Sequence, residues 1–222
     1  MSIAQNLTQI KSQLPTHVTL VAVSKTKPVA DLMEAYNAGQ HIFGENKIQE
    51  MTEKWEQMPK DIEWHMSGHV QTNKVKFMAE YVSLIHGVDS LKLLQEINKQ
   101  AKKYNRVIDC LLQIHIAEEE TKFGLDEEEL NHILTSDDFK SLENIRIVGL
   151  MGMATFTENQ NQIEKEFNHL KTIFDKLNKL SIINYQLSIL SMGMSGDYQL
   201  AISCGSTMVR IGSSIFGTRN YQ

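Results

Sequence analysis

Eight short apolar runs, most of them separated by segments with helical periodicity, restrict the folds open to this chain. The runs are predicted to be strands at residues 18–24, 40–43, 62–67, 82–86, 107–116, 145–151, 185–190 and 208–212. Between them, apolar residues recur at spacings of three and four, which is the period of an amphipathic helix. Two clear examples are Leu91, Leu94, Ile97 and Ala101, and Phe167, Leu170, Phe174 and Leu177.

Side chains that favour helix N-termini stand where this alternation predicts a helix to begin. Asp89 and Ser90 precede the first of the two helical segments, and Asp126 precedes a run that begins at Glu127. Asp and Ser side chains in such positions accept hydrogen bonds from backbone N–H groups of the first turn. The helix boundaries therefore agree with the strand boundaries.

Eight strands in 222 residues predict an α/β fold, a compact (β/α)8 barrel formed by one domain over residues 1–222. A doubly wound open sheet is the alternative, because a strand count does not reveal whether the sheet closes. No helix is predicted after the eighth strand, so we expect the N-terminal helix, residues 3–14, to cap the barrel floor. The ten residues after Gly212 leave no room for a second domain.

The charge balance and the cysteines favour a cytoplasmic protein that binds neither nucleic acid nor membranes, and we expect a monomer. A net charge of −5 gives no electrostatic attraction for polyanions. No segment approaches the roughly 20 apolar residues that span a bilayer, and the first residues, MSIAQNLTQIKSQL, indicate an amphipathic helix instead of a signal peptide. Cys110 and Cys204 lie far apart without metal-type spacing, and Cys110 is predicted to be a buried thiol.

Lys25 follows the first apolar strand directly, where a barrel would place it at the mouth. Functional side chains of (β/α)8 barrels gather at the carboxyl ends of the strands. Desolvation there lowers the pKa of a lysine and frees its amine to attack a carbonyl carbon. Two other interpretations remain at this point: the side chain reaches out to solvent, or it pairs with Glu45 after the second strand.

Glycine and serine residues follow the last two strands, where barrels often bind phosphate. Ser195 lies in the segment 191–197, and Gly212 and Ser213 follow the eighth strand, while Ser206 and Thr207 precede it with two further hydroxyls. Backbone N–H groups at such positions approach an anion closely. The alternative is that these residues only form tight turns and helix caps. A lysine that faces a phosphate site is the combination that pyridoxal 5′-phosphate (PLP) requires.

Arg210 and His65 complete the polar candidates within strands. Arg210 alternates with Val209 and Ile211, so its side chain points to the opposite face of the eighth strand. If that face is the barrel interior, a guanidinium beside the pyridine nitrogen of PLP would disfavour protonation of that nitrogen; otherwise Arg210 is a surface residue. His65 is either a ligand contact or a core histidine. Four further histidines show no ligand spacing, and we predict no metal site: His41, His69, His86 and His115.

Six sequence blocks together resemble the pyridoxal phosphate homeostasis protein family, which is related to the barrel domain of alanine racemase. They are VAVSKTKP (21–28), FGEN (43–46), WHMSGHVQTNK (64–74), GLMGMAT (149–155), LSMGMSGDYQLAI (190–202) and GSTMVRIGSSIFGTRNY (205–221). The resemblance covers essentially the whole chain in the same order.

The resemblance implies a modified (β/α)8 barrel that holds PLP as a Schiff base on Lys25, with Arg210 facing the pyridine nitrogen. It also implies that Asn46 and His65 line the remaining wall of the site. The residues implied to contact or frame the phosphate are Ser195, Ser206, Thr207, Gly212 and Ser213. The family role is buffering and delivery of PLP in the cytoplasm, with PLP-dependent apoenzymes as candidate recipients, and it implies no catalytic residue.

Three positions depart from the family pattern and put details of the pocket wall in doubt. Ser67 stands where isoleucine is expected, Gly87 where serine is common, and His115 where asparagine is common. Two enzymatic alternatives remain beside the carrier role. One is a weak PLP-dependent amino-acid racemase or lyase, and the other is a cofactor-free aldolase in which Lys25 is the nucleophile. Neither has an acid/base partner that the sequence assigns.

Overall fold

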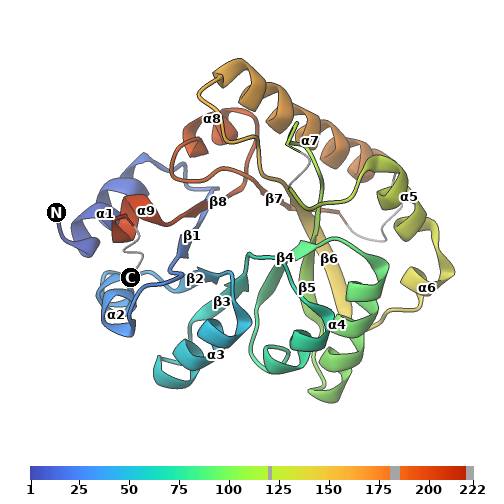
Figure 1. Ribbon diagram of the computed structural model, residues 1–222, viewed down its shortest axis with the longest axis horizontal. Helices are drawn as coiled ribbons and strands as arrows, with labels where there is room; N and C mark the ends of the chain where they lie inside the picture. Colours follow the sequence, from blue (N-terminus) through green and yellow to red (C-terminus); the bar gives the residue numbers. More distant parts are fainter. Residues whose placement is uncertain (120–121, 181–185, 219–222) are drawn as a thin grey trace.

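The computed structural model describes residues 1–119, 122–180 and 186–218, and its eight parallel strands close into a barrel (Figure 1). Consecutive strands pair with one another, and β1 pairs with β8 through four registered residues from Thr19↔Met208 to Ala22↔Ile211. The strands are β1 Thr19–Val23, β2 Ile42–Glu45, β3 Glu63–Met66, β4 Leu84–Val88, β5 Ile108–Gln113, β6 Ile145–Met151, β7 Ile189–Ser191 and β8 Met208–Ile211. Closure confirms the predicted barrel and excludes the open sheet.

Helices surround the barrel (Figure 1). The α-helices are α1 Ile3–Gln13, α2 Val29–Asn37, α3 Ile48–Gln57, α4 Leu91–Lys103, α5 Glu127–Thr135, α6 Asp137–Lys140, α7 Gln160–Leu180, α8 Tyr198–Ser203 and α9 Ser213–Phe216, and a 3-10 helix, η1, spans Thr72–Phe77. The predicted caps are confirmed: Ser90 Oγ accepts from Leu93 N, and Asp126 forms a reciprocal capping box with Glu129. In the described residues, no helix is long and apolar enough to span a membrane.

The apolar side chains form two layers because successive residues of a strand point to opposite faces. A small cluster fills the barrel interior, and a larger one lies between the strands and the helices. The interior cluster is centred on Val21, Leu84, Leu111, Met151 and Met208. Strands β6 and β7 approach so closely that a Cβ on Gly149 would lie 1.8 Å from the Ile189 carbonyl oxygen. Apolar side chains therefore fill the interior between the strands.

Two predictions about the ends of the barrel are wrong. A four-residue helix, α9, follows β8, although no helix was expected there. Helix α1 packs against α2 and α9 in the outer ring, so it does not lie across the floor (Figure 1). Leu7 and Ile10 supply the buried face of α1, and Asn6 donates to the carbonyl of Ile215 in α9. The N-terminal helix thus occupies the place that a full helix after β8 would take.

Three strands also lie nearer the carboxyl end than predicted, and one of them is β4, which spans Leu84–Val88 instead of residues 82–86. Strand β2 begins at Ile42 instead of residue 40, because the Gln40 amide bonds the carbonyls of Leu20 and Ile42 and ends the preceding turn. Strand β7 begins at Ile189 instead of residue 185, and residue 185 lies outside the described ranges. These shifts leave the order of the strands in the barrel unchanged.

Candidate functional site

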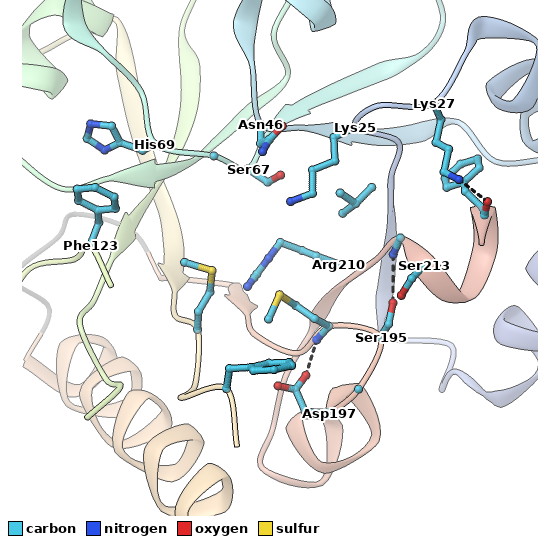
Figure 2. A pocket seen from close by; sticks show the side chains of 18 of the residues that line it. Lys25, Lys27, Asn46, Ser67, His69, Phe123, Ser195, Asp197, Arg210 and Ser213 are labelled. Atoms are coloured by element: carbon cyan, nitrogen blue, oxygen red, sulfur yellow. Dashed lines mark hydrogen bonds between the residues drawn. The ribbon is translucent and has the colours of Figure 1, made fainter. Parts of the chain in front are cut away.

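A cavity of about 480 Å³ opens at the carboxyl ends of the strands (Figure 2). Its wall is built from residues that end or follow several different strands, as expected for a (β/α)8 barrel. The described lining residues are Val23, Lys25, Lys27, Asn46, Ser67, Gly68, His69, Gln113, Phe123, Met153, Phe156, Met194, Ser195, Gly196, Asp197, Arg210, Gly212, Ser213, Phe216 and Gly217. Six of the nine predicted site residues are therefore brought together: Lys25, Asn46, Ser195, Arg210, Gly212 and Ser213.

Lys25 is half-buried and its side chain extends into the cavity, toward Arg210 (Figure 2). A tight turn follows β1, because the Lys27 N–H donates to the Ser24 carbonyl and Thr26 adopts a φ of 64°. The Glu45 carboxylate lies on the outer face of β2, where Oε1 accepts from Ser24 Oγ and Lys54 Nζ, each at 2.7 Å. The structure thus directs Lys25 to the interior and Glu45 to the helix layer.

Arg210 is buried and forms part of the cavity floor, so its side chain points into the barrel and is not on the surface. Its Nη1 donates to the Ser191 carbonyl at 2.9 Å and to Ser191 Oγ at 2.7 Å, and Nη2 donates to the Gly152 carbonyl at 3.1 Å. Burial lowers the pKa of Arg210 to about 10, and nearby Asp197 opposes this shift. The guanidinium therefore keeps its positive charge at neutral pH.

His65 does not line the cavity, although it was predicted to form part of the wall. It is 3% exposed and lies beneath the floor, where its Nδ1 is 3.1 Å from His86 Nε2. His86 Nδ1 is in turn 3.1 Å from Ser191 Oγ. Burial lowers the pKa of His65 to about 3, and burial, His65 and Arg210 hold the pKa of His86 well below its usual value. Both rings are neutral at pH 7.

Arg210 can only donate, so the Ser191 hydroxyl accepts from its guanidinium. A hydroxyl oxygen accepts up to two hydrogen bonds and donates one, so the tautomer of His86 decides whether Ser191 Oγ donates to His86 Nδ1 or accepts from it. In either tautomer, the two nitrogens of the neutral His86 ring join Ser191 to His65. Sequence reasoning missed His86 because only a metal role was considered for it, and alternation along β4 is the signal that places its side chain inside the barrel.

Ser195, Gly212 and Ser213 lie together at one side of the cavity, where β7 and β8 end (Figure 2). The Gly212 N–H donates to Ser195 Oγ at 3.3 Å, and Ser213 begins α9. Asp197 fixes the loop, because its Oδ1 accepts from the Met194 N–H at 2.6 Å, and burial raises the pKa of this carboxyl. The hydroxyls of Ser195 and Ser213 and the backbone of Gly212 thus lie together in this part of the cavity wall.

Ser206 and Thr207 do not join this group, and the expectation that they lie near it is wrong. They precede β8, so they lie at the amino end of the barrel, opposite the cavity. Ser206 Oγ has the carbonyls of Leu190, Met192 and Met208 within hydrogen-bond distance, with Met192 nearest at 2.7 Å. Thr207 Oγ1 accepts from the Leu190 N–H. Their hydroxyls tie β7 to β8.

The family comparisons agree over the length of the chain. The family model described as the alanine racemase N-terminal domain matches residues 1–220. A "Pyridoxal phosphate homeostasis protein" from Pasteurella multocida is 38% identical over 100% of this chain and 99% of its own length. One of that name from Aquifex aeolicus is 40% identical over 91% of this chain and 87% of its own length. The chain belongs to the pyridoxal phosphate homeostasis protein family.

A solved structure, PipY of Synechococcus elongatus PCC7942, is similar in both sequence and fold. PipY without PLP is 35% identical, with a TM-score of 0.91 over 97% of this chain and 100% of that chain. PipY with PLP bound gives a TM-score of 0.89 at the same identity and coverage. Alanine racemase from Clostridium difficile 630, with cycloserine, has a TM-score of 0.80 over 100% of this chain and 60% of its own, but its 18% identity supports the fold alone.

The three departures from the pattern of the pyridoxal phosphate homeostasis protein family lie at or near the mouth. Ser67 lines the cavity and donates to the Glu45 carbonyl. A Cβ on Gly87 would lie 2.7 Å from the Gly68 carbonyl oxygen, so a side chain there requires the neighbouring loop to shift. His115 Nε2 lies 3.1 Å from the Glu119 carbonyl oxygen. Of the three, Ser67 alone changes the described lining of the cavity.

Aromatic and methionine side chains at the mouth were not predicted, because they stand in loops without periodicity. Phe123 stacks on His69 with ring centroids 4.4 Å apart, and the Gln113 amide donates to the Phe123 carbonyl. Phe156 is 92% exposed and also lines the cavity. In the described ranges, no group of three or more His, Cys, Asp or Glu side chains is arranged to hold a metal ion.

Proposed function

We propose that this cavity holds PLP as a Schiff base on Lys25 and that the protein serves in PLP homeostasis. One observation carries the proposal: an amine and an anion site face the same cavity, with a guanidinium in its floor. Lys25 supplies the amine, Ser195, Gly212 and Ser213 supply the anion site, and Arg210 supplies the guanidinium. When bound, PLP supplies an aldehyde that condenses with an amine and a ring that can withdraw electrons.

The cavity fits PLP in its size and in the hydrogen-bond donors that line it. The cavity volume of about 480 Å³ lies within the roughly 300–1,000 Å³ typical of small-molecule sites. Apart from its two neighbours in the chain, no described residue has a heavy atom within 4 Å of the position that a Cβ on Gly196 would take, so there is open space beside this glycine. A Cβ on Gly212 would lie 2.9 Å from the Val23 carbonyl oxygen, so glycine permits the close backbone approach there. Asn46 contributes to the wall beside Lys25.

Arg210 explains why binding would exceed catalysis. Its guanidinium stays positively charged and is held by the carbonyls of Ser191 and Gly152. A fixed cation that faces the ring nitrogen disfavours protonation of that nitrogen, and an unprotonated ring withdraws electrons weakly. The buried row of Ser191, His86 and His65 holds the guanidinium in this direction.

The biological role that we infer is buffering and delivery of PLP, with PLP-dependent apoenzymes as recipients. The support is the family membership and the similarity to PipY, a structure of which contains PLP. The proposal includes a single barrel domain over residues 1–222, a cytoplasmic location, a monomer, and no nucleic-acid partner, in line with the net charge of −5.

A weak PLP-dependent racemase or lyase is the second candidate. Asp197 favours it, because this carboxyl lines the cavity and burial raises its pKa toward the range of a general acid/base. Its bond to the Met194 N–H supports a structural role instead. Loss of α-deuterium from alanine or serine separates the candidates, since sustained loss that Lys25→Ala and Asp197→Asn both abolish would favour the enzyme.

The experiment that tests PLP binding combines the visible absorbance spectrum with borohydride reduction and peptide mass mapping. We expect a yellow protein whose pyridoxyl adduct maps to the peptide that contains Lys25. Lys25→Ala should abolish the adduct, and Lys92→Ala, which removes an exposed lysine from α4, should leave it unchanged. A colourless protein that forms no adduct with excess PLP would refute the proposal and favour the aldolase hypothesis.

A further inference from the structure

A buried ammonium lies directly behind the turn that carries Lys25. Lys54, in the middle of α3, is 5% exposed, and its side chain crosses from the helix layer to the end of β1. Its Nζ donates to the Ser24 carbonyl at 2.9 Å and to the carboxylates of Glu45 and Glu50, each at 2.7 Å. An ammonium has three hydrogens, so these three bonds use all of them.

The same cluster holds the backbone on both sides of Lys25. On one side, the Ser24 carbonyl accepts from Lys54, and Ser24 Oγ donates to Glu45 Oε1. On the other side, the Thr26 N–H donates to Glu50 Oε1 at 2.6 Å. Side chains from β2 and α3, which follow Lys25 by about 20 residues or more in the sequence, thus hold the two residues that flank this lysine.

Thr26 makes this restraint necessary. Its φ of 64° lies in the left-handed region, which is unfavourable for a β-branched residue. Such conformations persist where the surrounding contacts hold them, and they are enriched at functional sites. Glu50 supplies the hydrogen-bond acceptor at this residue. Without it, relaxation of Thr26 would turn the Cα–Cβ bond of Lys25 away from its present direction.

We infer that Glu45, Glu50 and Lys54 form a positioning cluster that aims the Lys25 amine into the cavity. The inference rests on the proposed function, because it assigns the cluster to the placement of the nucleophile for PLP. It concerns geometry on the helix side of β1 and β2, and none of the three side chains lines the cavity among the described residues. Their contribution to PLP binding is therefore indirect, through the turn at 24–27.

Glu50 gives the cleanest test because its side chain is 23% exposed, so its loss leaves no fully buried gap. Glu50→Ala removes the acceptor for the Thr26 N–H, and Glu50→Gln keeps an oxygen there. Glu53→Ala is the matched control, since it makes the same chemical change on the exposed side of α3. Three rates are measured: amide exchange of the peptide that contains Thr26, Schiff-base formation with PLP, and reductive methylation of Lys25 by formaldehyde with cyanoborohydride as the reductant.

Loss of one hydrogen bond to a charged acceptor predicts about tenfold faster exchange at Thr26 and about tenfold slower reaction with PLP in Glu50→Ala. Methylation should stay within about twofold, because formaldehyde needs no particular orientation of the amine. Glu50→Gln should retain most of the wild-type rate, and Glu53→Ala should match the wild type. Methylation that rises together with exchange would indicate general loosening and overturn the positioning role.

Unchanged exchange and unchanged PLP rates in Glu50→Ala would also overturn the inference, as would faster exchange without any effect on PLP. A wild-type protein that forms no PLP adduct would refute the proposed function alone. In that case the amide exchange of Thr26 in the three variants still decides whether the cluster holds the turn. The two proposals can therefore fail separately.

Discussion

Replacement of Lys54 by methionine measures the contribution of the buried ion pair to stability. Lys54 Nζ lies 2.7 Å from Glu45 Oε1, and the two side chains are 6% and 0% exposed. Two unit charges at that distance attract by about 6 kcal/mol at an effective dielectric constant of about 20. Methionine also removes the cost of burying the ammonium, so we expect a net loss of about 3 kcal/mol in the free energy of unfolding.

The loss of unfolding free energy in Lys54→Met should depend on pH, because Glu45 gains or loses a proton. Burial raises the pKa of this carboxyl, whereas Lys54 and Ser24 lower it and Glu50 adds a smaller upward shift. In Lys54→Met the pKa rises further. Below the unfolded-state pKa of about 4.3, a carboxyl whose folded-state pKa is raised is protonated in both states and does not lower the free energy of unfolding. As the pH rises from there through the folded-state pKa, the free energy of unfolding falls, because the unfolded state releases the proton more readily. The deficit should therefore be small near pH 4.5 and full at pH 8.

Urea unfolding at both pH values provides the assay, because the slope with denaturant reports whether the folded state itself has changed. Glu45→Gln combined with Lys54→Met removes both charges and should recover much of the stability at pH 8. One unpartnered oxygen of Glu45, Oε2, is already buried, so the single variant leaves an uncompensated charge. A deficit below about 1 kcal/mol at pH 8, or one equal at both pH values, would refute this reasoning.

Three further predictions concern the site and the barrel. Ser195→Ala should weaken PLP binding about tenfold in equilibrium titration. Ser206→Ala should leave PLP binding unchanged and lower the free energy of unfolding, measured in urea, by about 1–2 kcal/mol. Equal effects of the two variants on binding would contradict the placement of Ser206 at the amino end of the barrel. Gly149→Ala should destabilise the barrel by more than about 4 kcal/mol, or prevent folding, because its Cβ would lie 1.8 Å from a carbonyl oxygen; a thermal midpoint equal to that of the wild type would be inconsistent with the observed spacing of β6 and β7. Burial raises the pKa of the Cys110 thiol, so a thiol reagent should label it only when urea unfolds the protein, and rapid labelling of the native protein would contradict its burial.

The fold was predictable because its main signals are local. The eight apolar runs all became strands, and Ser90 and Asp126 cap helices where their sequence positions indicated. Closure of the sheet was not contained in any local pattern, since it depends on β1 meeting β8 across the whole chain. Helix α9 was missed because four residues are too few to show helical periodicity.

The site was predictable where position relative to a strand decides it. Lys25 follows β1 directly, and alternation placed Arg210 on the face opposite Val209 and Ile211 but left open whether that face is the interior. Asn46 came from the family resemblance. Ser206 and Thr207 were misplaced because chemical type was given more weight than their position before β8 instead of after it. The pairing of Lys54 with Glu45 was beyond prediction, since it requires the distance between α3 and β2.

The buried row from Arg210 through Ser191 and His86 to His65 bears on how protons reach the cavity. The row runs through two neutral histidine rings, so a proton could move along it only if one of the histidines became charged. With a pKa of about 3 for His65 and a strongly lowered one for His86, neither does so at neutral pH. We therefore expect this row of buried side chains to carry no protons to the cavity at neutral pH. A molecule held in the cavity exchanges protons through the open mouth, where buffer composition can influence the rate.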